Sequence, residues 1–332
     1  MSRKCVTFSK NVFIPVTNVC RNACDYCVFK ARNIEAAYVT SVQDFLNVVQ
    51  HKGAATEALF SAGEHPELAY LSSFFNDSVT KEGFTSLVAY TKNLCEIAIQ
   101  QGLLPHCNLG VLSRDELKEL RDVNASMGLM LETTAELAAH KNSPGKDPSM
   151  RLKMIEEAGK LKIPFTTGIL VGIGEEQEDR IHSLNAIKSL HEQYGHIQEV
   201  IIQPFLPKQT TAMWNAKSPS FRVMKETVRA ARSLLPEDIA IQVPPNLTAP
   251  KELIELGASD LGGISERTID YINPESPWPT EAELRSKVAP FELRERLPIY
   301  PRFIKKGWYS EEISQLIERY ADEDGFRREE GF

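Results

Sequence analysis

The sequence NVFIPVTNVCRNACDYC, residues 11–27, joins a short apolar run to three cysteines spaced C-x3-C-x2-C. The run at residues 12–16 is typical of a buried strand, and we expect the cysteines to lie on the loop that follows it. Thiolates this close together can bind one polynuclear iron cluster, whose irons are normally held by four thiolates. Three local cysteines leave one iron of a cubane open to a small molecule. The stretch therefore predicts Cys20, Cys24 and Cys27 as ligands of an iron–sulfur cluster.

Two other interpretations of these cysteines are a structural zinc site and a disulfide pair. A closed zinc site needs four Cys or His ligands, usually in two spaced pairs, and no second pair lies nearby in the sequence. Disulfides are rare in the reducing cytosol, and the N-terminal sequence MSRKC is not followed by the long apolar segment of an export signal. The pattern therefore favours a cytoplasmic iron–sulfur protein.

Composition and charge narrow the class of protein further. The 332 residues are 42% hydrophobic and 25% charged, which is ordinary for a globular protein. A net charge of −7 argues against a nucleic-acid groove as the main function. No apolar run approaches the roughly 20 residues that cross a membrane. We therefore expect a small-molecule substrate, and neither nucleic acid nor a membrane as partner.

Short apolar runs alternate with longer amphipathic stretches, which is the pattern of βα units and a parallel sheet. We expect eight strands, near residues 12–16, 58–60, 103–105, 128–131, 165–171, 199–203, 239–243 and 260–264. We expect helices near residues 42–51, 84–101, 114–125, 150–161, 176–193, 221–235 and 251–255. Eight repeats over about 270 residues match a closed (β/α)8, or TIM-type, barrel. A partial barrel or an open doubly wound sheet is the alternative.

Two regions follow from this pattern. Residues 7–272 are expected to form the α/β barrel that carries the cluster, and residues 273–332 an irregular and helical C-terminal cap over one barrel face. The second region is rich in proline, and a charged amphipathic helix is expected to begin near Ser310.

Barrel enzymes build their active sites at the C-terminal ends of the strands, and candidate polar residues fall there. Gly63 and Glu64 follow the second strand, where glycine lets backbone approach a ligand closely; the alternative is a loop glycine beside a solvated carboxylate. Glu132 follows the fourth strand, and a buried carboxylate needs partners such as ribose hydroxyls or a cation. Arg151 is a candidate for that cation or for binding a ligand carboxylate, unless it is an ordinary surface arginine.

Other strand ends carry uncharged polar residues. His106 and Asn108 follow the third strand and either face a substrate or pack in the core. The ends of the sixth, seventh and eighth strands carry a neutral hydrogen-bonding set: Gln203, Gln242, Asn246, Ser265 and Thr268. Such a set suits a polyhydroxylated heterocycle better than a phosphate.

The C-x3-C-x2-C motif with Tyr26 before its third cysteine resembles the radical S-adenosylmethionine (SAM) superfamily. The resemblance implies a [4Fe-4S] cluster whose open iron binds SAM, and a reductant such as ferredoxin or flavodoxin. One electron then produces a 5′-deoxyadenosyl radical that abstracts a hydrogen atom. The resemblance also implies SAM contacts by Tyr26, Gly63, Glu64, Glu132, Arg151 and Gly172. In the superfamily's Gly-Gly-Glu element, Ala62 replaces the first glycine here.

Longer segments resemble one family within that superfamily, the CofG-type first subunits of 7,8-didemethyl-8-hydroxy-5-deazariboflavin (FO) synthase. These segments are TFSKNVFIP at 7–15, SPGKDP at 143–148, IPFTTGILVGIGE at 163–175, GGIS at 262–265 and DYINPESPWP at 270–279. The resemblance implies a lyase of coenzyme F420 biosynthesis. A partner radical SAM subunit would join a 4-hydroxybenzyl group to 5-amino-6-ribitylaminouracil, and this chain would cyclise the adduct with loss of ammonia.

Only one cysteine triad is present, so the partner subunit would supply the adduct. Asp270 and Asn273 are candidate substrate contacts, although their loop could instead only shield the radical from water. Two other functions fit the motif: another barrel-type radical SAM enzyme, of the menaquinone, biotin or thiazole pathways, or an iron–sulfur carrier.

Overall fold

The computed structural model of this protein describes residues 5–329, in which eight parallel strands close into a barrel. The strands follow one another around the barrel in chain order, and β2 pairs with β1 to close it. This confirms the closed barrel over the open sheet. The strands are β1 (Cys5–Thr17), β2 (Glu57–Ala62), β3 (Leu104–Asn108), β4 (Ser126–Gly128), β5 (Phe165–Val171), β6 (Ile197–Pro204), β7 (Ala240–Gln242) and β8 (Asp260–Ile264).

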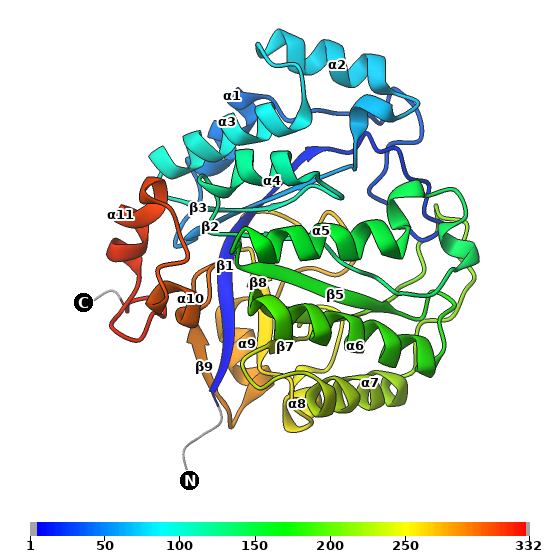
Figure 1. The fold of residues 1–332 in the computed structure, drawn as a ribbon, viewed down its shortest axis with the longest axis vertical. Helices are drawn as coiled ribbons and strands as arrows, with labels where there is room; N and C mark the ends of the chain where they lie inside the picture. Colours follow the sequence, from blue (N-terminus) through cyan, green and yellow to red (C-terminus); the bar gives the residue numbers. More distant parts are fainter. Residues whose placement is uncertain (1–4, 330–332) are drawn as a thin grey trace.

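Helices cover the outside of the barrel, and Figure 1 shows α5, α6 and α7 side by side there. The helices are α1 (Val42–Val49), α2 (Ser72–Lys81), α3 (Leu87–Gln100), α4 (Arg114–Arg121), α5 (Pro148–Lys160), α6 (Gln177–Tyr194), α7 (Phe221–Leu234), α8 (Pro250–Glu255), α9 (Glu281–Val288), α10 (Pro301–Lys305) and α11 (Glu311–Tyr320). Local sequence signals set where several of them begin. Ser113 and Glu116 form a capping box at the start of α4, and Asp147 caps α5 ahead of Pro148.

Four elements were not expected from the sequence, among them the short helix α10. Helix α2 buries only Phe75 and Val79, so its apolar pattern is weak. Helix α9 completes the eighth βα unit beyond the expected barrel boundary. Strand β9 (Glu292–Glu295) pairs with the first residues of β1, outside the closed barrel, and its mostly charged sequence does not look like a strand.

The end of β4 also differs from the prediction, because the strand stops at Gly128 rather than continuing to Leu131. Beyond it, Glu132 makes a single bridge to Ile169 of β5 and adopts a positive φ of 66°. The backbone therefore leaves the regular sheet just where the predicted carboxylate stands.

The C-terminal region contacts both ends of the barrel. Residues 270–278 lie at the mouth, where Asp270, Asn273 and Trp278 border the pocket described below. Residues 296–320 close the opposite end, where Leu297, Ile299 and Phe303 share a second apolar core with α11 and Leu104. Figure 1 shows α10 and α11 together at that end, in orange and red. None of the helices in the described part of the chain is long and apolar enough to span a bilayer.

Candidate active site

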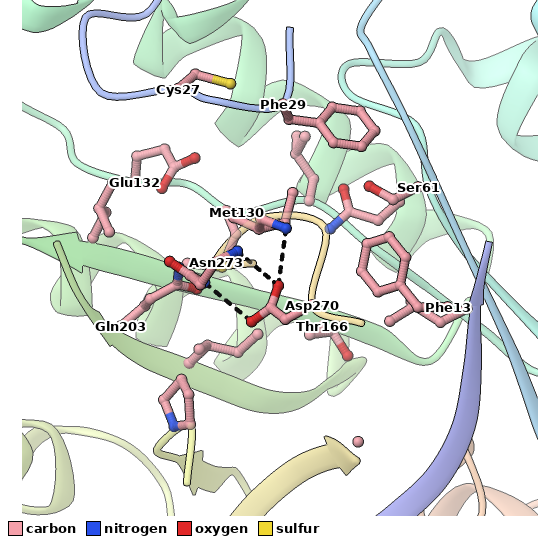
Figure 2. A pocket seen from close by; sticks show the side chains of 18 of the residues that line it. Phe13, Cys27, Phe29, Ser61, Met130, Glu132, Thr166, Gln203, Asp270 and Asn273 are labelled. Carbon is pink, nitrogen blue, oxygen red and sulfur yellow. Dashed lines mark hydrogen bonds between the residues drawn. The ribbon is translucent and has the colours of Figure 1, made fainter. Parts of the chain in front are cut away.

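One pocket, of about 370 Å³, runs from the cysteine loop into the barrel. We use "cysteine loop" for residues 18–31, which follow β1. Figure 2 shows Cys27 and Phe29 of this loop, with Asp270 and Asn273 on a separate loop that borders the same pocket. The predicted cluster ligands, SAM contacts and substrate contacts line this pocket, except Gly172: they are Cys20, Cys24, Tyr26, Cys27, Gly63, Glu64, Glu132, Arg151, Asp270 and Asn273. Of the uncharged candidates, His106, Asn108, Gln203 and Gln242 also line it, whereas Asn246, Ser265 and Thr268 do not.

The three cysteines are free thiols that share this pocket. The backbone N–H groups of Asn22 and Glu64 donate to Cys20 Sγ, at N···S distances of 3.4 and 3.2 Å. Burial raises the pKa of Cys20 to about 11 and also raises the pKa of Cys27, so both thiols are protonated until a metal displaces the proton. Hydrogen bonds to sulfur are typical of iron–sulfur ligation, so the donor set fits a cluster.

The three cysteines do not converge on one point in the structure. Within residues 5–329, no group of three or more His, Cys, Asp or Glu side chains converges on a position that could hold one ion. A cubane makes a different demand, because each of its thiolates binds a different iron atom.

Gly63 is required by the cysteine loop itself. A Cβ at this position would lie 2.1 Å from the carbonyl oxygen of Val19 and 2.8 Å from Cys20 Cβ. The Gly63 N–H donates to the Thr17 carbonyl at 2.7 Å, which holds the end of β2 against the start of the loop. The glycine therefore allows two backbone segments to meet where Cys20 must be placed.

We expect Gly63→Ala to lower the iron bound per chain after anaerobic reconstitution, and to cost about 1–3 kcal/mol of stability by overpacking. Gly83→Ala is the matched control, since its φ of 89° strains the new side chain but no other residue lies within 4 Å of it. The control should lose stability and keep its iron. Equal iron content in the two variants would contradict the role of Gly63.

Glu64 is buried, and both of its carboxylate oxygens have partners within the protein. Its Oε1 accepts from Arg21 Nε at 3.0 Å, and its Oε2 accepts from the Val111 N–H at 3.1 Å. Arg151 Nη2 lies 3.4 Å from Oε2. Burial alone would raise the pKa of Glu64, but Arg151 and these hydrogen bonds hold it below its usual value. The carboxylate therefore links the cysteine loop to α5 and is not a solvated group, while it still lines the pocket.

Glu132 has a cation partner, Lys146, that the sequence reasoning did not single out. Lys146 Nζ lies 2.5 Å from Glu132 Oε1. Burial alone would raise the pKa of Glu132, but Lys146 and then Arg151 hold it below its usual value. Lys146 lies within the SPGKDP segment at 143–148, which already marked the region as distinctive.

Arg151 is buried, with 3% of its surface exposed, so it is not a surface arginine. Its Nε donates to the Gly145 carbonyl at 2.8 Å, and its Nη1 donates to the Met130 carbonyl. With Nη2 facing Glu64, each guanidinium nitrogen has a protein partner. The residue therefore holds the pocket wall together.

Tyr26 and Gly172 complete the predicted set. The Tyr26 hydroxyl lies 3.0 Å from His140 Nε2, and burial raises the pKa of this phenol well above its usual value. Burial also lowers the pKa of His140 to about 4, so the two form a neutral pair beside Lys146. Gly172 has a φ of 102°, and its N–H donates to the Glu175 carboxylate at 2.8 Å. It shapes the turn after β5 from outside the pocket.

Asp270 and Asn273 belong to a loop at the mouth of the barrel. Asp270 Oδ1 accepts from the backbone N–H groups of Ile272 and Asn273, at 2.9 and 3.0 Å. Its Oδ2 accepts from Asn246 Nδ2 at 3.0 Å. Asn273 Oδ1 accepts at 2.9 Å from Lys208, a buried lysine that the sequence reasoning missed. Asp270 therefore builds the loop while bordering the pocket.

Comparison with known proteins agrees with this site. The model of the Radical SAM superfamily matches residues 14–187. The chain is 54% identical over 330 residues to 7,8-didemethyl-8-hydroxy-5-deazariboflavin synthase of Methanococcoides burtonii, covering 98% of each chain. It is 51% identical over 327 residues to the protein of that name from Archaeoglobus fulgidus, covering 98% of this chain and 99% of the other.

Solved structures share the fold at low identity. The FeFe-hydrogenase maturase HydG from Carboxydothermus hydrogenoformans superposes with a TM-score of 0.73 at 17% identity, covering 96% of this chain and 74% of the other. Methylornithine synthase (PylB) gives a TM-score of 0.61 at 18% identity, covering 95% and 81%. Together with the cysteine pocket, the full-length relatives show that the chain belongs to the radical SAM superfamily and, within it, to the family of 7,8-didemethyl-8-hydroxy-5-deazariboflavin synthases.

Proposed function

We propose that this chain is the cyclising subunit of FO synthase. Its substrate would be the adduct of a 4-hydroxybenzyl group and 5-amino-6-ribitylaminouracil, and its product FO, released with ammonia. The observation that supports this best is the continuous pocket that joins the cysteine triad to a polar barrel interior, in a chain 54% identical to an FO synthase over nearly its whole length.

Cys20, Cys24 and Cys27 would hold the [4Fe-4S] cluster, and SAM would bind beside it. When bound, this pair supplies a 5′-deoxyadenosyl radical that abstracts a hydrogen atom. The charged wall formed by Glu132, Lys146 and Arg151 lies on the same pocket. We propose that Lys146 binds the SAM carboxylate and that Glu132 binds the ribose hydroxyls. Arg151 is not assigned to SAM, because each nitrogen of its guanidinium already has a protein partner. Tyr26 and the backbone of Gly63 border the same space.

Glu64 and Gly172 would act indirectly, through the cysteine loop and the turn after β5. Asp270 would hold the mouth loop over the substrate, with Asn273 and Lys208 presented to the pocket. Burial lowers the pKa of Lys208 despite the nearby Asp270 carboxylate. Lys208 also pairs with Glu275 and donates to Asn273, so we assign it to hydrogen bonding at the mouth. The partner radical SAM subunit would supply the adduct, and a small reductant would supply electrons.

The decisive test uses the reconstituted protein under anaerobic conditions with dithionite, SAM and the purified adduct. We expect 5′-deoxyadenosine and deazaflavin fluorescence to appear together. Formation of 5′-deoxyadenosine without fluorescence would support the radical chemistry and contradict the proposed substrate. Neither product, from protein shown to carry its cluster, would favour an iron–sulfur carrier.

We expect Lys146→Met to raise the KM for SAM on the order of tenfold or more, as the loss of a hydrogen bond to a charged group implies. Cluster content should stay unchanged, because Lys146 touches no thiol. Lys141→Met replaces an exposed lysine in the same region and serves as the control. An unchanged KM for SAM would remove Lys146 from the site.

A further inference from the structure

The pocket continues past the mouth toward the N-terminal half of the strands, where its walls are polar. Barrel interiors are usually filled by branched apolar side chains. Here six buried polar residues besides Arg296 line the deep end of the pocket. We call this set the floor: Ser9 and Asn11 of β1, Glu57 of β2, His106 of β3, Thr166 of β5 and Glu199 of β6. None of them contacts the cysteines or the Glu132–Lys146 pair in the hydrogen bonds of the described residues.

The hydrogen-bond pattern fixes the form of His106. Ser126 Oγ donates its one hydrogen to the Pro298 carbonyl at 2.7 Å. His106 Nδ1 lies 2.7 Å from Ser126 Oγ. Because the hydroxyl hydrogen is already donated to Pro298, Nδ1 must carry a hydrogen and donate it to Ser126 Oγ. Burial, and then the positive charge of Arg296, lower the pKa of His106 to about 3, so the ring is neutral. Its Nε2 is therefore a hydrogen-bond acceptor.

Asn11 and Glu57 provide two more acceptors on the floor. Asn11 is 2% exposed, and its Oδ1 has no hydrogen-bond partner among the described residues. Glu57 is 5% exposed, and Ser9 Oγ, 2.8 Å from its Oε2, is its hydrogen-bond donor. Burial raises the pKa of Glu57 to about 7 despite the neighbouring Arg296. A buried acceptor left unpaired costs about 1–3 kcal/mol, which a ligand that brings donors would recover.

We infer that Asn11, Glu57 and His106 form a subsite for the hydroxyl-rich chain of the substrate, which on the proposed function is its ribityl group. Hydroxyl groups donate to all three acceptors and can accept in turn from any hydroxyl nearby. Anionic groups are disfavoured, because Arg296, the cation beside the floor in the described part of the chain, is paired with Asp260 and Glu199.

The same contacts set the direction in which the substrate lies. Asn11 lies six residues before Thr17, the last residue of β1, which is about 20 Å along an extended strand. An extended substrate with its polyol on the floor would therefore place its ring system toward the cysteine loop. Gln203 and Gln242 line the intervening wall, and their amides match the donors and acceptors of a uracil edge.

The test compares two substrates: the ribityl adduct, and an adduct carrying an N-ethyl group in place of ribityl. We expect the wild type to prefer the ribityl adduct by 100-fold or more in kcat/KM, as a site built to hydrogen-bond hydroxyls should. Glu57→Gln and Asn11→Leu should each lower kcat/KM for the ribityl adduct about tenfold, a loss of about 1.4 kcal/mol. Neither should change kcat/KM for the N-ethyl adduct. Gln203→Leu, on the wall between the floor and the cysteine loop, should by contrast lower kcat/KM for both substrates.

Dissociation constants of the two adducts, measured by calorimetry without reductant, give a second readout that needs no turnover. Equal losses on both substrates, or a wild type that does not discriminate between them, would overturn the subsite. A wild type that binds the ribityl adduct through the floor yet makes no FO would instead overturn the proposed function. The two failures are therefore separable.

Discussion

Cys24→Ala should abolish both 5′-deoxyadenosine and FO formation while leaving the barrel folded. Cys24 lines the pocket with Cys20 and Cys27 and is a free thiol. With two of the three thiolates left, a cubane would keep two open irons, and neither its binding nor its orientation would be secured. The side chain is partly exposed and packs in no apolar core, so its loss costs little stability. Iron per chain, circular dichroism and product formation measure the three effects separately.

The matched control is Cys5→Ala, which makes the same chemical change at an exposed cysteine on β1. The control should bind iron and form both products at the wild-type rate. Cys95 and Cys107 are less useful, because their sulfurs lie 3.5 Å apart in the buried core. Retention of deoxyadenosine formation by Cys24→Ala would show that the triad does not hold the cluster.

The sequence predicted the parts of the molecule that depend on local patterns. The eight barrel strands follow from short apolar runs, and the cysteine loop from the spacing of three residues after one of them. The candidate residues were found because parallel strands end at the same edge, so that Glu64, Glu132 and the cysteines meet in one pocket.

What the sequence could not show is which partner each polar residue takes. Glu64 has Arg21, the Val111 N–H and Arg151 as partners, and only the folded chain brings these groups together. His106 could be core or substrate contact, and the hydrogen bond from Ser126 to Pro298 was needed to define its free nitrogen. Strand β9 was missed because edge pairing places few demands on side chains.

Arg296→Met should destabilise the protein by about 3–5 kcal/mol, because it leaves two buried carboxylates without their cation. Arg296 is 3% exposed; its Nε lies 2.7 Å from Asp260 Oδ2 and its Nη2 lies 3.0 Å from Glu199 Oε2. Its guanidinium also stacks on Tyr300, 4.3 Å from the ring centre. These contacts join the C-terminal region to the starts of β6 and β8. Thermal unfolding should show a fall in Tm on the order of 10 °C.

Arg294→Met is the matched control two residues earlier. Arg294 is one-third exposed and pairs with Asp322 at 2.8 Å and Asp324 at 3.4 Å. Surface ion pairs of this kind contribute about 0–1 kcal/mol, so the control should unfold close to the wild type. Adding Asp260→Asn and Glu199→Gln to Arg296→Met should recover part of the loss. A fall in Tm equal to that of the control would mean that the buried cation is not required.

The pH dependence of this loss identifies its cause. Burial alone would raise the pKa of Asp260, but Arg296 holds it below its usual value, so this carboxylate stabilises the wild type above its ordinary pKa. Without Arg296, burial is left unopposed and raises the pKa of both carboxyls in the folded variant. Stability of the variant should then rise as pH falls and the carboxyls take up protons. The difference in unfolding free energy should therefore shrink between about pH 8 and about pH 5. If the effect came from lost packing against Tyr300, the difference would stay constant over that range.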